Sequence, residues 1–360
     1  MDPRIRKLAQ QTIRYSLNVK PGTNVIISGG EESREFILEL YKEVILRGAY
    51  PVLDINLNGI NDFYYKYATD EQLKKFPDLK MHIVKNSQYY VGINTTSNTR
   101  ELTNVDPKKI MLRRKVTNPI SDHIVNSAGK KEGWMKRVTI GFPCLALAQD
   151  AEMSINEYEN FVFSCCLIDW KKFGKRLDSL CKIFEKGKEI YLLGEGVDLK
   201  FSIKGKNCVA DKGEENMPGG EVFMAPVRES LNGWIKFDYP RIVNGNLISG
   251  VKLKFENGKV VEFSAEKGQE FLKELLNTDE NAKYVGEFGV GCNPMINKYT
   301  NDLLFDEKMD GTIHLALGMA YKENGGGNDS AIHMDVVKDM KKAKIILDGK
   351  VIQENGKWKI

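Results

Sequence analysis

The stretch NVIISGGEESREFILELYKEVILRGAYPVLDIN, residues 24–56, decides the fold class of the N-terminal half. Its opening run is rich in β-branched residues and ends at the pair Gly29-Gly30, which is typical of a strand. Residues 31–48 then carry apolar side chains at helical spacing and stop at Gly48, and residues 50–56 again resemble a strand. Alternation of this kind predicts an open, mainly parallel sheet with helices.

The same alternation continues towards residue 187. Residues 89–94 and 137–143 have the pattern of strands, and helical patterns occur around residues 70–76 and within 144–186. The first half is therefore predicted to be an α/β domain with a mainly parallel open sheet. The pair Gly29-Gly30 lacks the G-x-G-x-x-G spacing of a dinucleotide-binding loop, so we expect it only to end a strand.

Beyond residue 187 the pattern changes, because strands now follow one another directly. Two segments, 249–265 and 343–360, carry Asn-Gly or Asp-Gly between alternating apolar residues, which is a strong hairpin signal. One helix is expected at about 266–277. The second half is therefore predicted to be a mainly antiparallel β domain of the α+β kind. The predicted domains are residues 1–187 and 188–360.

Charge and hydropathy exclude several classes of partner. The 53 basic and 49 acidic residues are mixed along the chain and leave a net charge of only +4, so no nucleic-acid partner is expected. No apolar run approaches the ~18 residues that span a bilayer, so no membrane partner is expected. The N-terminus has the pattern of an amphipathic helix without the apolar centre of an export signal, which predicts a cytoplasmic protein.

Two of the four histidines occupy neighbouring segments of the second half, DGTIHLALGMAY (310–321) and NDSAIHMD (328–335). In an extended strand, His314 shares one face with small residues, and the apolar residues between them face the core. In an extended HMD segment, His333 and Asp335 point the same way and can converge on one ion. This arrangement predicts a metal site.

Carboxylates from other segments extend this site. Glu221 starts a strand after Gly219-Gly220, and Glu287 lies on an apolar strand with several glycines. A buried carboxylate is costly unless a cation accompanies it, and a metal ion supplies one. Glu307, seven residues before His314, is a further candidate.

Four carboxylates and two neutral imidazoles would nearly balance two divalent cations bridged by an oxygen species. Nitrogen and oxygen ligands without sulfur suit zinc, cobalt or manganese, and paired ions of this kind serve hydrolysis. Taken singly, a strand glutamate is usually a surface or edge residue, and a lone histidine is more often a hydrogen-bonded core residue than a ligand.

Several ordered motifs resemble the thermophilic metalloaminopeptidase family, the aminopeptidase T and aminopeptidase S group. They are PGTNVIISGGEESREFILELYKEVILRGAYPVL, FPCLALAQDAEMSINEYENFVF, NMPGGEVFMAPV, VGEFGVGCNP, FDEKMDGTIHLALGMAY and NDSAIHMD. The resemblance runs the full length of the chain. It implies two divalent ions per chain (cobalt, zinc or magnesium) and a homodimer whose catalytic centres face an internal cavity and accept short peptides. The metal ligands that it implies are Glu221, Glu287, Glu307, His314, His333 and Asp335.

The expected function is removal of N-terminal residues from peptides with a free N-terminus, by a water that two metal ions share. Glu287 is the expected bridging carboxylate, because its strand is expected to be the most buried. Tyr321, seven residues after His314, matches a tyrosine near the metals and is expected to stabilise an oxyanion or hold a ligand. Two alternatives remain: another dinuclear metallohydrolase, such as an amidase or phosphoesterase, and a non-catalytic binding module that a metal stabilises.

Overall fold

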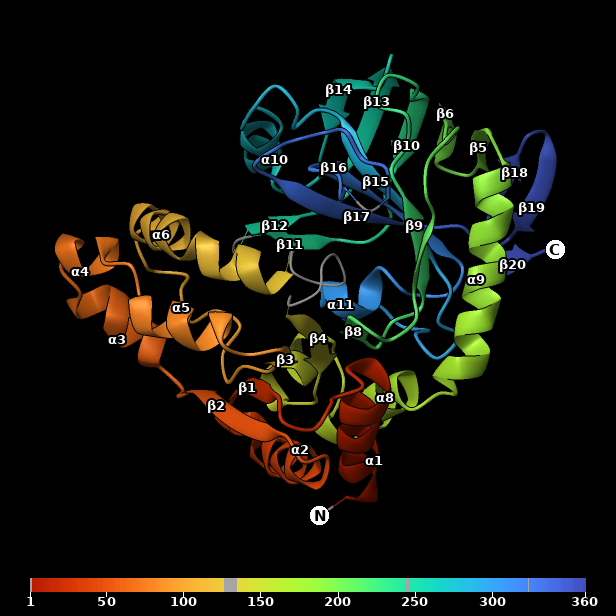
Figure 1. The fold of residues 1–360 in the computed structure, drawn as a ribbon. Coiled ribbons are helices and arrows are strands. Elements are labelled where there is room, and N and C mark those ends of the chain that lie inside the picture. The colour runs from red at the N-terminus through yellow and green to blue at the C-terminus, as the bar shows by residue number, and fades with distance from the viewer. Residues whose placement is uncertain (1, 126–134, 244–245, 323) are drawn as a thin grey trace. The chain divides into compact units, whose positions relative to one another are not determined.

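The computed structural model describes residues 2–125, 135–243, 246–322 and 324–360. The chain forms two compact units (Figure 1). Unit 1 consists of residues 1–167 and 213–218, and unit 2 of residues 168–212 and 219–360. No helix in the described part of the chain is both long enough and apolar enough to cross a bilayer.

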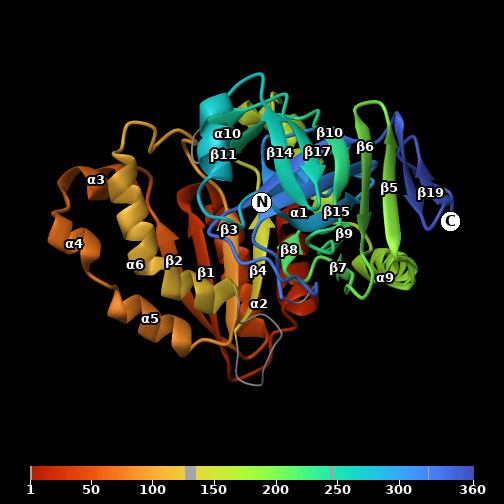
Figure 2. The same ribbon diagram turned by 90° about the horizontal axis from the view of Figure 1, so that it is seen from above.

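Unit 1 is built on a five-stranded parallel sheet with the order β2-β1-β3-β4-β8, and Figure 2 shows these strands side by side. The strands are β1 Asn24–Gly30, β2 Tyr50–Asn56, β3 Tyr89–Asn94, β4 Lys136–Gly141 and β8 Asn216–Met217. The predicted parallel α/β sheet is confirmed. Its short last strand, β8, comes from the excursion of the chain at residues 213–218.

Helices connect and cover the strands of this sheet. The crossover helix α2 packs on β1 and β2, and α6 precedes β4 and packs on it. Side chains cap the N-termini of three of these helices: Asp2 caps α1, Thr69 caps α4 and Ser154 caps α8. The helices are α1 Pro3–Gln11, α2 Arg34–Leu46, α3 Ile60–Tyr67, α4 Asp70–Lys74, α5 Asp78–Lys85, α6 Pro107–Val125, α7 Leu145–Asp150 and α8 Ile155–Cys166, with short turns η1 Thr12–Ser16 and η2 Glu31–Ser33.

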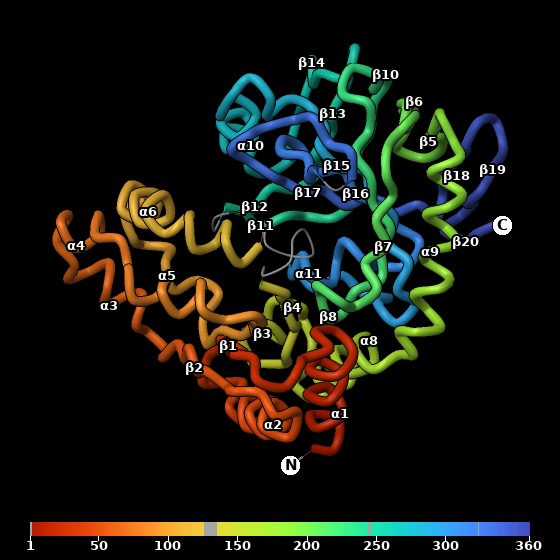
Figure 3. Tube along the Cα trace, viewed as in Figure 1, coloured from red at the N-terminus to blue at the C-terminus, as the bar shows by residue number. Residues whose placement is uncertain are grey.

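Unit 2 contains two larger antiparallel sheets and one small hairpin, as predicted for a mainly antiparallel domain. The eight-stranded sheet has the order β14-β13-β10-β6-β5-β18-β19-β20, and the five-stranded sheet has the order β17-β16-β15-β9-β7. Figure 3 traces the last strands of the chain (blue) beside β5 (green). The strands of the eight-stranded sheet are β5 Glu189–Gly194, β6 Val197–Ser202, β10 Asn232–Lys236, β13 Lys252–Glu256, β14 Lys259–Ser264, β18 Ala343–Leu347, β19 Lys350–Glu354 and β20 Lys357–Trp358.

The five-stranded sheet carries the residues singled out in the sequence. Its strands are β7 Val209–Asp211, β9 Glu221–Met224, β15 Val285–Gly291, β16 Thr312–Gly318 and β17 His333–Asp339. The remaining elements of unit 2 are the hairpin β11 Arg241–Val243 and β12 Asn246–Ile248, and the helices α9 Trp170–Lys186, α10 Gln269–Leu276 and α11 Leu303–Asp306.

One hydrophobic core joins the two large sheets of unit 2 and helix α9. Phe288 of β15 meets Phe201 of β6 with ring centroids 5.1 Å apart, and it also meets Phe184 of α9 at 6.4 Å. Alternate residues of β16 and β17 enter the same core. One face of the five-stranded sheet is thus closed by apolar packing, which leaves the opposite face for polar side chains.

The helices predicted within 144–186 are present as α7, α8 and α9, because the capping residue Ser154 starts α8 and Asp169 starts α9. Other elements differ from the prediction. The last hairpin has a third strand, because Asn355-Gly356 forms a second turn after Asp348-Gly349. Helix α6 was not predicted; it contains Pro119, and Ile120 is its only buried side chain among the described residues, so it lacks an apolar stripe.

The domain boundary at residue 187 stays a prediction. The compact units differ from it in two respects: α9 belongs to unit 2, and residues 213–218 return to unit 1. The first difference arises because the apolar face of α9, with Leu177, Leu180 and Phe184, packs in the core of unit 2.

Candidate metal centre

Four adjacent strands of the five-stranded sheet bring the predicted site residues to one face. In β16 and β17, Ala316 pairs with Asp335 and Gly318 pairs with His333. On the other side of β16, Ala316 pairs with Glu287 of β15. The carboxylates of Glu287 and Asp335 therefore flank a residue that has only a methyl side chain. Glu221 enters from β9, where it pairs with Gly291 of β15.

A β-bulge beside Glu287 lets Val285 and Glu287 face opposite sides of the sheet. The register of β15 against β16 shifts between Val285 and Glu287, so Gly286 is the extra residue. Without the shift, Val285 and Glu287 would face the same way. With it, Val285 joins Phe288 in the hydrophobic core while Glu287 faces the opposite side. A side chain at Gly286 would overlap the backbone carbonyls of residues 318 and 319, which explains the glycine.

The imidazole of His314 lies over Gly289, its partner on β15. A Cβ atom at Gly289 would overlap the Cε1 and Nε2 atoms of the ring. The small residue Gly289 on the neighbouring strand leaves a space on this face, and the imidazole ring of His314 occupies that space. His314 is fully buried.

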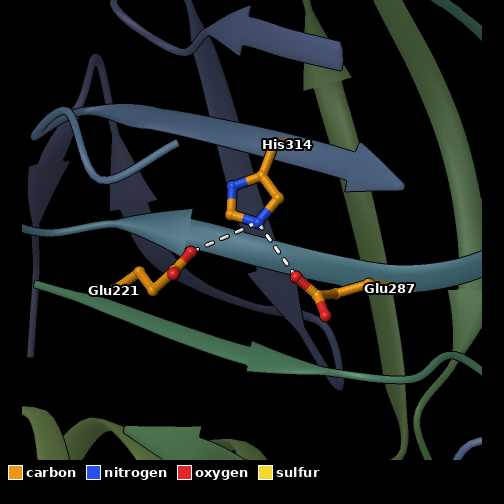
Figure 4. A group of neighbouring side chains, drawn as sticks. All are labelled: Glu221, Glu287 and His314. Atoms are coloured by element: carbon orange, nitrogen blue, oxygen red, sulfur yellow. Dashed lines mark hydrogen bonds and ion pairs between the residues drawn. The ribbon is translucent and has the colours of Figure 1, made fainter. Parts of the chain in front are cut away.

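His314 lies between two carboxylates (Figure 4). Its Nε2 atom is 3.3 Å from Oε1 of Glu287, to which it donates a hydrogen bond, and 3.3 Å from Oε2 of Glu221. Both residues are about as buried as the core, since Glu221 is 4% exposed and Glu287 is 5% exposed. Two buried acids directed at one imidazole nitrogen form the first of two groups of potential ligands.

His333 and Asp335 lie at the β17 side of the same face. The Nδ1 atom of His333 donates to the carbonyl of Met319 at 2.9 Å, and this fixes the ring with Nε2 3.5 Å from Oδ2 of Asp335. Because a carbonyl only accepts, Nδ1 carries a proton, and Nε2 is the nitrogen that faces the carboxylates and would bind a metal ion. Metal-binding histidines are commonly oriented in this way.

The donor atoms fit divalent metal ions. Glu221, Glu287 and His314 offer ligand atoms within 4.8 Å of one another, and so do Glu287, His333 and Asp335. Glu287 belongs to both groups. Glu221, Glu287 and Asp335 each keep one buried oxygen without a hydrogen-bond partner, and such atoms in a buried site call for a cation. The structure thus brings five of the six predicted ligands together.

The shifted pKa values of these groups reflect burial and mutual charge. Burial raises the pKa of Glu221 well above its usual range, although Lys308 opposes this, and burial likewise raises the pKa of Glu287. Burial opposes a charged His314, but Glu287 and Glu221 outweigh it and raise its pKa to about 10. Without metal, protons therefore occupy positions that a cation would take, and metal binding has to release them.

Glu307, the sixth predicted ligand, belongs to neither group. It follows α11, and its Oε1 atom pairs with the ammonium group of Lys308. Lys308 also faces Glu221 and Asp211. Burial would lower the pKa of Lys308, but these carboxylates hold it above the ordinary range. Sequence patterns did not indicate Lys308 or Asp211, since lysine is normally exposed and the short strand β7 was not predicted.

Tyr321 lies beside His333, with ring centroids 5.1 Å apart, and its ring also meets Phe223 of β9 at 6.5 Å. The tyrosine ring is therefore next to the second group of potential ligands, and its proximity to metal ions stays a prediction. The packing of its ring between two site strands limits where its hydroxyl group can go.

Comparison with known families agrees with a metal site on this face. The family model described as thermophilic metalloprotease (M29) matches residues 1–358. The chain belongs to this metalloprotease family. It is accordingly a metal-dependent peptidase.

Individual members of the metalloprotease family are distant but extend over nearly the same length. Aminopeptidase AmpS of Bacillus subtilis (strain 168) is 26% identical, with 99% of this chain and 98% of that protein covered. Aminopeptidase T of Thermus thermophilus is also 26% identical, with coverage of 92% and 91%.

Solved structures share the fold. Wild-type AmpT from Thermus thermophilus superposes with a TM-score of 0.88 at 24% identity and covers 99% of both chains. A 2,5-dihydroxypyridine dioxygenase from Pseudomonas putida KT2440 has a TM-score of 0.63 at 12% identity, with coverage of 98% and 96%. Because the second protein is named for a different reaction, the fold does not determine the chemistry, and the site residues must carry that argument.

Replacement of Gly289 by alanine tests the placement of His314. The added methyl group would displace the imidazole from its position over β15, so the affinity for zinc should fall by roughly 10- to 100-fold. Calorimetric titration of chelator-treated protein measures this affinity. Gly327→Ala is the control, because nothing lies within 4 Å of a Cβ at that position. Wild-type affinity in Gly289→Ala would show that His314 is not needed for metal binding.

Proposed function

We propose that this chain is an aminopeptidase with a dinuclear metal centre, and that it removes the N-terminal residue from short peptides. The observation that carries the proposal is the pair of three-residue groups that share Glu287. Five residues would hold the ions, namely Glu221, Glu287, His314, His333 and Asp335. A ligand role for Glu307 stays a prediction.

The number of ligands supports a catalytic centre over a structural one. Each group offers three protein ligands, and catalytic sites of this kind keep a further position for water or substrate, whereas structural sites are closed. The donors are nitrogen and oxygen, which suits cobalt, zinc or magnesium. When bound, two such ions acidify a water molecule and withdraw charge from the carbonyl group of the scissile bond.

The protein's own residues fix the geometry of this site. Glu287 is the shared carboxylate and is held by the bulged strand, so its position does not depend on a flexible loop. His333 keeps one ring orientation through its bond to the Met319 carbonyl. Burial of Glu221, His314 and Asp335 limits access of bulk water, which strengthens each electrostatic interaction inside the site.

Tyr321 is proposed to act on the substrate oxyanion. Its ring packs beside His333, and a phenol hydroxyl can donate a hydrogen bond to the oxygen on which negative charge develops. Glu287 is the second residue proposed as catalytic. A carboxylate of the site would carry the proton to the leaving amine.

The substrate class rests on the relatives. AmpS of Bacillus subtilis and aminopeptidase T of Thermus thermophilus are both named aminopeptidases, which supports substrates with a free N-terminus. An amidase or phosphoesterase would use a similar pair of ions, and a metal-stabilised binding module would use the ligands without turnover.

A homodimer is also proposed. Neighbouring elements of unit 1 expose large apolar side chains, including Ile45 on α2, Leu53 on the edge strand β2 and Phe63 on α3. Exposed apolar side chains on an edge strand and its flanking helices support association with a second copy. The cytoplasmic location stays a prediction.

A substrate panel with and without metal tests the function. Chelation should abolish release of the first residue from short peptides with a free amine, and added cobalt or zinc should restore it. N-acetylated peptides and phosphate esters should remain intact. Activity that survives complete metal removal would contradict the mechanism. Cleavage of the acetylated peptides or the esters would favour the rival hydrolases, and bound metal without any turnover would favour a binding module.

Tyr321→Phe tests the proposed donor. Loss of one hydrogen bond to the oxyanion should lower kcat by roughly 100-fold, while metal content remains at the wild-type level because the phenyl ring still packs on His333. Steady-state kinetics and elemental analysis measure the two quantities. Tyr191→Phe, on β5 of the other sheet, is the matched control. An unchanged kcat would remove Tyr321 from the mechanism.

A further inference from the structure

Lys308 is fully buried, which is unusual for a lysine, and its ammonium group lies among three carboxylates. The Nζ atom is 3.3 Å from Oε1 of Glu221 and 3.8 Å from Oδ2 of Asp211, and it pairs directly with Glu307. A charge removed from water in this way costs several kcal/mol before its partners offset it. Burial at that cost, next to the candidate metal centre, suggests a role there.

The backbone holds Lys308 close to β15. The lysine carbonyl accepts a hydrogen bond from the amide of Asn293 at 3.0 Å, just after the end of that strand. Gly291 permits this approach, because a Cβ there would overlap the backbone carbonyl of Met309. The main chain of Lys308 is therefore held beside β15, and its buried ammonium group is held by the three carboxylates around it.

Two of the three carboxylates face one another across a strand pair. Asp211 of β7 is the register partner of Glu221 of β9, so both side chains emerge on the same face. Directly opposed like charges destabilise an antiparallel pair. Lys308 offsets this repulsion because it faces both carboxylates. If Lys308 had only a structural role, this would be its whole contribution.

Glu221, however, divides its two oxygens between different partners. Oε1 is 3.3 Å from the ammonium group of Lys308, and Oε2 is 3.3 Å from Nε2 of His314, with which Glu221 shares the first group of potential ligands. On the basis of the proposed function, we propose that Lys308 is a positioning residue for the metal centre. It anchors one oxygen of Glu221, so that the other is presented to the ion that Glu221 and His314 would share.

Charge balance agrees with this role. The ligands Glu221, Glu287 and Asp335, together with Asp211 and Glu307, carry five negative charges. Lys308 and two divalent ions carry five positive charges. The lysine therefore completes a neutral buried centre and would not compete with the ions for it.

The direction in which metal affinity changes when Lys308 is removed distinguishes a positioning role from simple repulsion of cations. If Lys308 only repelled nearby cations, its removal would tighten metal binding. If it anchors Glu221, its removal weakens binding at the site of Glu221 and His314. The site of His333 and Asp335 is affected less, since neither residue contacts the lysine in the described structure.

The experiment is a titration of metal-free wild type and Lys308→Met with cobalt(II), followed by calorimetry and by the visible absorption of the bound ion. Wild type should bind two ions. Lys308→Met should bind one of them at least tenfold more weakly, with loss of the absorption that belongs to that site. Lys338→Met is the matched control, because Lys338 is also buried but forms its ion pair with Asp238, which is not a proposed ligand.

The double variant Lys308→Met/Asp211→Asn covers the case in which the single variant does not fold. It removes one charge of each sign and still lacks the anchor, so it should show the same weakened site. Two ions bound with wild-type or higher affinity in either folded variant would overturn the inference. A wild-type protein that fails to bind two ions would instead contradict the proposed function itself.

Discussion

The constraint on which the site depends is the burial of three carboxylates on one face of a sheet. Glu221, Glu287 and Asp335 are each no more than 5% exposed, and each keeps an oxygen without a hydrogen-bond partner. Such a group of acids is stable only if protons or cations accompany it. Without metal, protons serve this purpose, and the raised pKa values of Glu221 and His314 reflect that. In the functional protein, the proposed metal ions would take their place.

The five-stranded sheet is built to meet that constraint. Its apolar face packs against the second sheet and α9, which fixes the strands in register. On the polar face, Gly289 makes room for an imidazole and Ala316 separates two carboxylates. The bulge at Gly286 returns Val285 to the core although Glu287 faces the other side. A ligand set carried by rigid strands is well suited to hold charged groups at fixed distances. The likeness to a protein named as a dioxygenase indicates that this fold can serve another reaction.

Much of this could be predicted from local patterns. The two-residue period of strands put His333 and Asp335 on one side, and it separated His314 from the apolar residues of β16. The alternation of strand and helix patterns was enough to predict the parallel sheet of unit 1. The features that were missed depend on contacts distant in sequence. Lys308 becomes buried only when the loop after α11 meets β15, Asp211 faces Glu221 only through the register of β7, and α6 has almost no apolar stripe to reveal it.

The central claim is that two ions share Glu287, and anomalous diffraction from crystals grown with zinc or cobalt tests it most directly. The account predicts two anomalous peaks on this face of the sheet. One should be bounded by Glu221, His314 and Glu287, and the other by Glu287, His333 and Asp335. A single peak, or peaks that none of these side chains contact, would contradict it.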